Sequence, residues 1–457
     1  MPTSLRPLQS GDHAEVQALF ARHGWPQRSP AGWLWALHHN PARLQAGAEA
    51  GWVLQHEGAL VGFLGNLPQT YHLDGQRLVG ATCTSYVVDD KQRAHSIKLM
   101  QAFAAQPQVA FLHSATANRH SAAVYKLFRF KALTDPRANF LMRWVASDSA
   151  FLHCAMLAKG LASPALARPV ARLAAPAWRW LRQAKGWSSV PQTPYAGSSS
   201  KVAADQLAPG GDLAASWDLW AQAMHNGPGL QLDRSAASLA WRLADPDQAG
   251  QLALIALRDE QQRLQGMCLL RALAEHPSRT PRAELIDWAV LQQTPLQACA
   301  ALMAAAVGWA QQRGLPMLDA KRFTGQAADV LSLLKPALSA LPGDANWVLT
   351  RHAALKQQPG AGLPWAMTGA DGDDWFVVFG CAGGAGGADG PSARADLDLA
   401  HAEQGTVQLR HQLGDSADSA GVKTQHVDLG AGPLLNGSHQ IEKRQAVQQA
   451  AVENQQV

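Results

Sequence analysis

Length, composition and charge already exclude several classes of protein. The chain has 457 residues, which at roughly 150 residues per domain predicts about three domain-sized units, or two with long linkers, and its 47% apolar content excludes a wholly disordered chain. The formal net charge of +4 is too small to build a phosphate-binding face, so we expect no nucleic-acid partner. Five widely spaced cysteines without a CxxC pair indicate neither disulfides nor zinc. The N-terminus has no apolar segment of the kind found in signal peptides, and no stretch reaches the roughly 18 uninterrupted apolar residues of a membrane span. We therefore expect a cytoplasmic protein without a metal.

The predicted elements begin with a pattern that occurs twice. Near the start, a Trp-containing helix ends at Asn40-Pro41, and a hairpin of two apolar strands follows over residues 52–63. About two hundred residues later, a second Trp-containing helix ends at Asp245-Pro246, and a hairpin follows over residues 252–267 with nearly the same spacing. We infer that the chain is duplicated.

The first copy continues as a strand, a polar loop and a helix. The β-branched run at 81–88 predicts the strand, and Ile97, Met100 and Phe103 have the spacing of one helix face. A second short strand is predicted directly beyond this helix, and a second helix at 121–130.

These elements resemble the GCN5-related N-acetyltransferase superfamily, which binds acyl-coenzyme A at a strand-to-helix junction. The family's loop reads Arg/Gln-x-x-Gly-x-Gly/Ala, and Arg93-Ala-His-Ser-Ile-Lys98 stands in its place, while Asn118, Tyr125 and Phe130 follow in the order of a later family segment. The resemblance covers residues 5–145. It implies an α+β fold with mixed sheets, built as two tandem acyltransferase-like units of which the second is degenerate.

The resemblance implies acetyl-coenzyme A or another acyl-coenzyme A as co-substrate. A pyrophosphate binds well to the free amides of a helix's first turn, but Ser96 and Lys98 replace two small residues of the family pattern and crowd this approach. Lys98 could instead contact a phosphate, with Arg93 beside it, and a solvated helix start without a ligand is the alternative. The expected cofactor-binding residues are Val87, Val88, Arg93, Ala94, His95, Ser96, Ile97, Lys98 and Asn118.

Tyr125 and His113 are the catalytic candidates. The resemblance implies that Tyr125 protonates the departing thiolate, and a phenol with a pKa of about 10 suits a thiolate of similar basicity, although a packing role is the alternative. Asn118 either orients the coenzyme or caps a helix. Because residues 81–88 hold no carboxylate, His113 is the candidate general base, with a buried structural histidine as the alternative.

The second copy lacks the features of a phosphate site. After the strand that ends at Val290, a long Ala-rich helix begins at Pro295 without a matching loop and without a basic residue in its first turns. Residues 161–187 combine basic residues with Leu, Ala and Trp, a composition that can lie on an anionic membrane surface. Because Pro169 and Pro176 are expected to interrupt any continuous helix, an inter-domain connector is the preferred interpretation.

Together these patterns divide the chain into four parts. We predict an acyltransferase-like domain at 1–145, a basic, Trp-rich connector and linker at 146–210, a degenerate second domain at 211–382 and a disordered, low-complexity tail at 383–457.

Three functions remain open on the sequence. We expect an acyl-coenzyme A dependent acyltransferase, and foremost an N-acetyltransferase that transfers the acyl group directly to a small-molecule amine. A tandem-fold aminoacyl transferase has a similar layout, but the modest charge argues against charged tRNA as a substrate. A non-catalytic acyl-coenzyme A binding or scaffold protein, which kept the fold and lost the site, is the third possibility.

Overall fold

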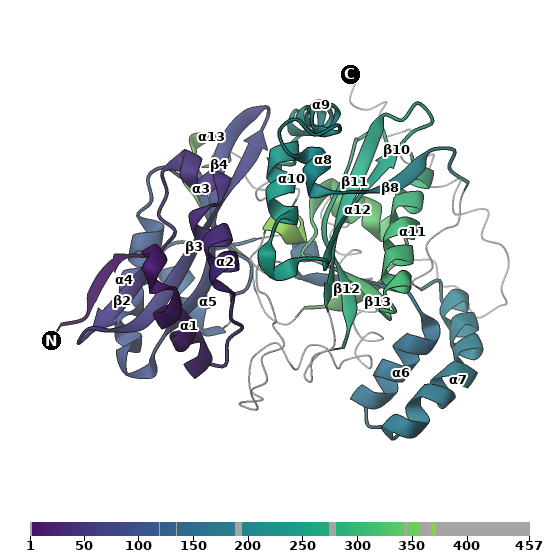
Figure 1. Cartoon of the computed structure of the whole chain (residues 1–457), viewed down its shortest axis with the longest axis horizontal. Coiled ribbons are helices and arrows are strands. Elements are labelled where there is room, and N and C mark those ends of the chain that lie inside the picture. Colours follow the sequence, from purple (N-terminus) through teal and green to yellow (C-terminus); the bar gives the residue numbers. More distant parts are fainter. Residues whose placement is uncertain are drawn as a thin grey trace, which may run out of the picture. The chain divides into compact units, whose positions relative to one another are not determined.

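Two β-sheets organise the described part of the chain, which comprises residues 2–117, 119–133, 135–187, 194–273, 280–341, 346–356, 365 and 367–371 of a computed structural model (Figure 1). All of these residues belong to one compact unit. The predicted tail at 383–457 and the candidate residue Asn118 lie outside the described residues.

The first sheet consists mainly of strands from the first copy. Its strands are antiparallel from the edge as far as β4, and β4 then pairs in parallel with β5. In order across the sheet, the strands are β1 (Ser4–Pro7), β2 (Gly51–His56), β3 (Ala59–Leu73), β4 (Gln76–Val88), β5 (Phe111–Ser114), β15 (Trp347–Thr350) and β6 (Lys131–Ala132), and β9 (Leu230–Leu232) pairs with β3.

The second sheet repeats this plan. An antiparallel run ends at β12, which pairs in parallel with β13, and the remaining pairs are antiparallel. The strands, in order, are β8 (Ser198–Val202), β10 (Leu252–Arg258), β11 (Leu264–Leu273), β12 (Arg282–Val290), β13 (Met317–Lys321), β7 (Phe140–Val145) and β14 (Ala337–Ala340). The predicted fold class, two tandem units with mixed sheets, is confirmed.

Each copy supplies at least one strand to the sheet of the other. Strand β15 comes from the end of the second copy and lies between β5 and β6 of the first sheet, where Trp347 pairs with Ser114 and with Ala132. Strand β7 comes from the end of the first copy and lies between β13 and β14 of the second sheet. A boundary at residue 145 therefore does not separate the two sheets, because β7 precedes it in sequence and pairs beyond it.

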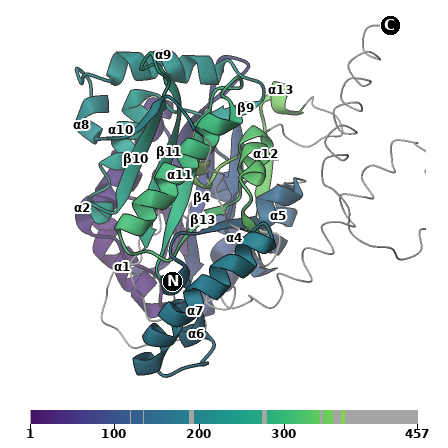
Figure 2. The ribbon, with the colours of Figure 1, turned by 90° about the vertical axis from the view of Figure 1, so that its right-hand side faces the viewer.

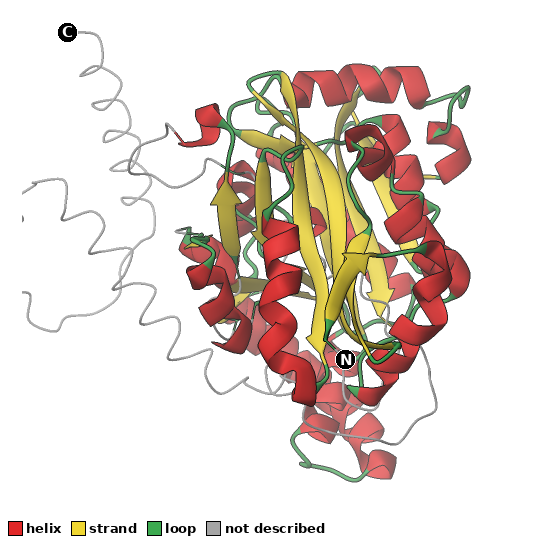
Figure 3. Ribbon diagram, turned by 90° about the vertical axis from the view of Figure 1, so that its left-hand side faces the viewer, coloured by secondary structure: helices red, strands yellow, loops and turns green. Residues whose placement is uncertain are grey.

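Helices cover the sheets, and their ends follow local sequence signals (Figure 3). The side chain of Asn40, for example, accepts hydrogen bonds from the amides of Ala42 and Arg43 and so caps a helix that begins at Pro41. The α-helices are α1 (His13–Arg22), α2 (Pro30–Trp33), α3 (Pro41–Ala46), α4 (Ser96–Ala104), α5 (Arg119–Leu127), α6 (Asp148–Ala158), α7 (Pro164–Ala184), α8 (Ala204–Leu207), α9 (Ala214–His225), α10 (Ala236–Leu243), α11 (Leu296–Gln312), α12 (Gly325–Leu333) and α13 (Ala353–Lys356).

The main apolar core lies between the sheets and joins the two copies. Phe63 and Tyr71 of β3 belong to the same buried cluster as Ile286 of β12. The two tryptophans of the repeated pattern meet here, since the rings of Trp35 and Trp241 stack with centroids 4.6 Å apart and Trp35 Nε1 donates to the carbonyl oxygen of Trp241 over 3.0 Å. Separate clusters place α4 and α5 on the first sheet and α11 on the second, as Figure 2 shows for α11.

Helix α7 corrects the prediction for residues 161–187. The chain forms one helix from Pro164 to Ala184, and Pro169 and Pro176 stand inside it. Pro164 occupies the first helical position, where no amide hydrogen bond is lost, and the two inner prolines are exposed on one side of the helix. Packing against α6 outweighs the missing backbone hydrogen bonds.

No helix in the described part of the chain combines the length and the hydropathy needed to cross a bilayer.

Candidate functional site

The parallel strands β4 and β5 pair over three residues and then separate. Gly80, Ala81 and Thr82 pair with Phe111, Leu112 and His113, whereas β4 continues to Val88 with β3 as its neighbour. An irregularity in the β3–β4 register accompanies this divergence, and Ser85 adopts a left-handed φ of 53°. Beyond Thr82, no strand in the described part of the chain pairs with the edge of β4 that faces β5.

The predicted pyrophosphate loop has helical structure. Residues Asp90–His95 form a 3-10 helix that continues directly into α4, and the amide of Ser96 donates to the carbonyl oxygen of Arg93. In a 3-10 helix the amides bond internally to carbonyls three residues earlier. A phosphate that used the Ser96 amide would therefore have to displace this hydrogen bond.

The predicted loop side chains also have partners. Arg93 pairs with Asp90 on the surface, and Lys98 Nζ donates to the carbonyl oxygen of Thr3 over 2.8 Å. Ser96 and His95 are half-buried, and Val87 and Val88 are buried. Ala94 and Ile97 are exposed at the same junction. The structure thus brings the predicted residues together at one end of β4, but it turns Lys98 toward β1.

Asp89 gives the start of this loop a negative charge. Although burial opposes the shift, hydrogen bonds from Arg22 and His23 lower the pKa of Asp89, with Arg22 Nη2 at 2.8 Å and His23 Nε2 at 2.9 Å. These partners offset a charge that would otherwise repel a phosphate.

Tyr125 is buried on the outer face of the first sheet. It belongs to the cluster that contains Val88 and Leu112, on either side of the β4–β5 opening. Its ring lies 5.2 Å from that of Phe130 and stacks with Trp347 at 6.4 Å, between centroids. Trp347 belongs to β15, so the exchanged strand supplies part of the surroundings of this candidate acid.

His113 lies at the point where β4 and β5 separate. It is 1% exposed, its ring is 4.7 Å from that of Trp365, and burial lowers its pKa to about 3. The imidazole is therefore neutral at physiological pH, and it is a weaker base than an ordinary histidine.

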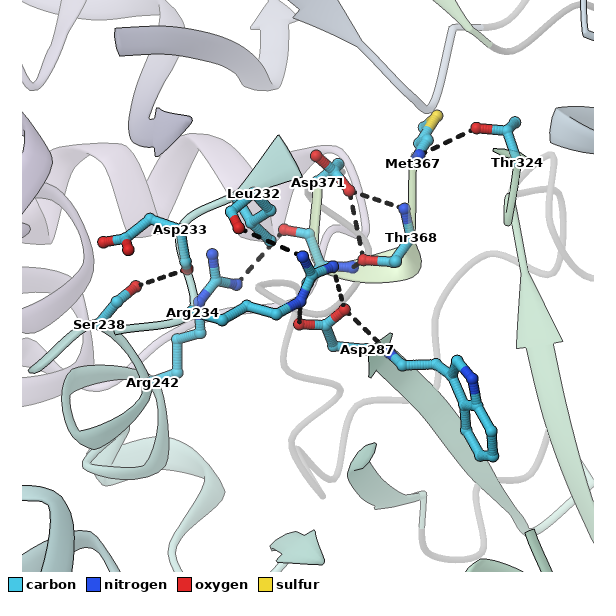
Figure 4. A network of polar contacts seen from close by, with 12 residues as sticks. Leu232, Asp233, Arg234, Ser238, Arg242, Asp287, Thr324, Met367, Thr368 and Asp371 are labelled. Carbon is cyan, nitrogen blue, oxygen red and sulfur yellow. Dashed lines mark hydrogen bonds and ion pairs between the residues drawn. The ribbon is translucent and has the colours of Figure 1, made fainter. Parts of the chain in front are cut away.

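A buried polar network between the sheets could not be read from the sequence (Figure 4). Arg234 forms two hydrogen bonds with Asp287 of β12, at 2.8 and 2.9 Å, and Arg242 Nη2 donates to Gln69 of β3 over 2.6 Å. The pairs come from distant parts of the chain, and no local motif marks them.

Asp371 connects this network to the first sheet. Its carbonyl oxygen accepts hydrogen bonds from Gln69 and Thr82, both at 3.0 Å, and its carboxylate accepts from Trp365 Nε1 at 3.0 Å and the Thr368 amide at 2.7 Å. Burial raises the pKa of Asp371 to about 6. The sequence shows an acidic turn after Trp365, but it does not indicate against which part of the molecule this turn packs.

The second junction differs from the first in its side chains. Strands β12 and β13 pair only over Ala283–Leu285 and Leu318–Ala320, so the backbone opens as it does in the first copy. Helix α11 begins after Pro295 as predicted, without a charged residue in its first turn, and packs most of its length into the core.

Among the described residues, His72, His225 and Asp233 form one group that could hold a metal ion. The two imidazoles stack with centroids 3.6 Å apart and planes 4° apart, and His225 Nε2 accepts the amide hydrogen of Arg234 over 3.3 Å. Parallel rings direct their lone pairs side by side and not toward a common point. Burial, with His72 nearby, lowers the pKa of His225 to about 4. Because the Nε2 lone pair of His225 already accepts the Arg234 amide, the arrangement favours ring packing over metal binding.

No family model and no curated protein matches the chain. Among solved structures, it is similar to a GCN5-related N-acetyltransferase from Anabaena variabilis, with 13% identity over 76% of this chain and 72% of that chain and a TM-score of 0.47. Saccharomyces cerevisiae N-myristoyltransferase with bound myristoyl-CoA and inhibitors has 10% identity over 81% and 87% of the two chains and a TM-score of 0.46. A conserved protein from Enterococcus faecalis, described as a probable N-acyltransferase, has 13% identity over 77% and 72% and a TM-score of 0.43. All three scores are below 0.5, so the function of this chain has to be argued from its own residues.

Proposed function

We propose that the chain is an acyl-coenzyme A dependent acyltransferase whose co-substrate binds at the junction of β4 and α4. The observation that carries this proposal is the separation of β4 from β5 after Thr82, next to the start of α4. An open strand edge can pair with an extended molecule through backbone hydrogen bonds, and the amide-containing arm of coenzyme A has that character.

The reaction we propose is transfer of an acetyl group to a small-molecule amine. The neutral amine attacks the thioester carbonyl, a C–N bond forms and the C–S bond breaks. Backbone amides on the edge of β4 that β5 leaves unpaired stabilise the oxyanion in this scheme. Tyr125 gives its proton to the departing thiolate and regains one from solvent, while the amine proton leaves to water. The shared cluster of Tyr125 and Val88 supports this placement of the acid.

His113 has a limited role in this scheme. With a pKa lowered to about 3, its neutral imidazole does not take a proton from an alkylammonium ion at neutral pH. The acceptor amine therefore has to arrive unprotonated, and the pH dependence of the rate should follow the pKa of the amine.

A non-catalytic acyl-coenzyme A binding protein is the second candidate. The buried His113, whose pKa is lowered to about 3, and the packing of the Tyr125 ring against Phe130 and Trp347 favour it, because both weaken the case for proton transfer at this site.

Calorimetric titration of the full chain with acetyl-coenzyme A tests the proposal. Ser96→Trp fills the first turn of α4 and should abolish binding, whereas Gln297→Trp, an exposed position in the first turn of α11, should leave it unchanged. Equal losses in both variants, or no binding by the wild type, would contradict the assignment.

Release of free thiol separates the two candidates. An acyltransferase at saturating acetyl-coenzyme A should release thiol faster when a suitable amine is present. Tight binding without such release, over a broad set of amines, would favour the non-catalytic alternative.

A further inference from the structure

Helix α7 presents an apolar stripe that no described residue covers. Leu166, Val170, Leu173 and Trp180 follow one another at helical spacing and are 60%, 42%, 83% and 70% exposed. Leu161, just before the helix, is 69% exposed. A contiguous exposed stripe of large apolar side chains marks an interaction site more often than scattered exposed leucines do.

The other side of α7 fixes the helix to the rest of the unit. Ala167, Ala171 and Ala175 are buried, and α7 packs beside α6 (Figure 2). The rings of Phe151 and Trp178 stack at 5.8 Å between centroids. This packing settles which face remains open, since the stripe and the small alanines lie on different sides of the helix.

Charge separates this helix pair from the rest of the chain. Between residues 148 and 187 the only acidic residue is Asp148, which is buried and paired with Arg179 at 2.8 Å and Arg182 at 3.0 Å. The basic residues of the same segment are Lys159, Arg168, Arg172, Arg179, Arg182 and Lys185. Six basic residues against one acidic residue give +5, whereas the whole chain has a formal charge of +4, so this segment accounts for the entire positive surplus.

We propose that α7 lies flat on the surface of a bilayer that contains anionic lipid, with Leu166, Leu173 and Trp180 in the acyl-chain boundary. A helix with leucine and tryptophan on one face and arginines flanking it has the composition of an interfacial helix. The exposed Arg168 and Arg172 have stems long enough to reach the phosphates of the headgroups while the stripe is inserted. The absence of acidic residues from α7 selects a lipid surface over a mixed-charge protein surface as its occupant.

Flotation of the full-length chain with vesicles tests this proposal. Phosphatidylcholine vesicles with about one third phosphatidylglycerol should carry the protein at about 0.1 M salt, and pure phosphatidylcholine vesicles should carry far less. Binding should weaken at about 0.5 M salt because the electrostatic attraction is screened.

Substitutions on the stripe give the sharper comparison. Leu173→Glu and Trp180→Glu place charges on exposed positions and should each lower vesicle affinity at least about tenfold, with thermal unfolding unchanged. The double variant Arg168→Gln, Arg172→Gln should lower the vesicle affinity by about fivefold for each charge removed. Leu219→Glu is the matched control, because Leu219 is 71% exposed on α9, outside the stripe.

Three outcomes would overturn the proposal. The first is that the wild type does not bind anionic vesicles. The second is that the stripe variants bind vesicles as well as the wild type does. The third is that the wild type binds no vesicles but self-associates in sedimentation, and that Leu173→Glu abolishes this self-association. The last result would assign the stripe to a second copy of the chain.

Discussion

The two strand-to-helix junctions of this molecule have the same backbone plan and different chemistry. Both follow a parallel pair that separates after three residues, β4 with β5 and β12 with β13. The first junction leads through a surface loop with basic side chains into α4, whereas the second passes Pro295 into α11, whose first turn carries no charge. The two junctions thus share their packing plan, while basic side chains lie at the first and not in the first turn of α11 at the second. The fold therefore does not indicate by itself where function lies.

The largest predicted effect concerns Tyr125 of α5. The corresponding helix of the second copy, α12, has no tyrosine, so this residue distinguishes the two copies. Tyr125→Phe removes one hydroxyl from a buried ring. If it is the general acid, kcat should fall by about 10²- to 10⁴-fold at saturating acyl-coenzyme A, with little change in coenzyme affinity. Turnover close to that of the wild type would show that Tyr125 is a packing residue and not the general acid.

The second prediction contrasts the ion pairs of the two junctions. Arg234 and Asp287 are 2% and 1% exposed, so Asp287→Asn leaves a buried cation without its counterion and should lower the free energy of unfolding by about 3–5 kcal/mol. Asp90→Asn at the first junction breaks an exposed pair with Arg93. It should change the free energy of unfolding by less than about 1 kcal/mol. Urea unfolding measures the stability of both variants. Similar losses of stability in the two would contradict this prediction.

The third prediction concerns pH, through buried groups at the first junction and at the contact between α9 and β3. His113 and His225 have pKa values lowered to about 3 and 4, so below an ordinary histidine pKa of about 6.5 the unfolded chain binds more protons than the folded chain. The stability that they contribute is full above about pH 6.5 and is lost as the pH falls. Asp371, with its pKa raised to about 6, has the opposite sign between about pH 4 and 6.

Urea unfolding at pH 7 and pH 5 checks these signs. We expect the wild type to be less stable at pH 5, His113→Gln to show a smaller difference between the two pH values, and Asp371→Asn a larger one. A wild type that is more stable at pH 5 would contradict the environments described for both histidines.

The smallest predicted effect is at Lys98. Because Lys98 Nζ already donates to the carbonyl oxygen of Thr3, Lys98→Ala should change coenzyme A affinity by less than about threefold. A loss of about tenfold or more in the same titration would show that Lys98 leaves Thr3 and contacts a phosphate when the coenzyme binds.

Periodicity and spacing were sufficient to predict the repeated hairpins, α4 and the entry of α11 at Pro295. These elements follow from local signals, which are alternation in strands, helical spacing and capping residues. The prediction missed helix α7 because it considered only the backbone hydrogen bonds that the prolines remove. The buried Ala171 and Ala175 show that α7 also gains contacts by packing on one face, which stabilise it as a helix.

The strand exchange and the buried network could not be predicted for a different reason. The short apolar runs of β7 and β15 do not show which neighbour they join, because the backbone hydrogen bonds of a ladder are the same whichever strand supplies them. Similarly, Arg234 and Asp287, or Thr82 and Asp371, become partners only after the two sheets face each other. The predicted site residues Val87–Val88 and Arg93–Lys98 do lie at one junction, and their roles stay predictions.

The exchange of β7 and β15 constrains how the chain can be made. Synthesis proceeds from the N-terminus, so β5 and β6 emerge from the ribosome with the place between them vacant until residues 347–350 follow. Until then the nascent first sheet has two unpaired strand edges, and such edges recruit other chains. A chain that ends before residue 347 leaves these edges unpaired, and we expect it to aggregate more readily than the full chain.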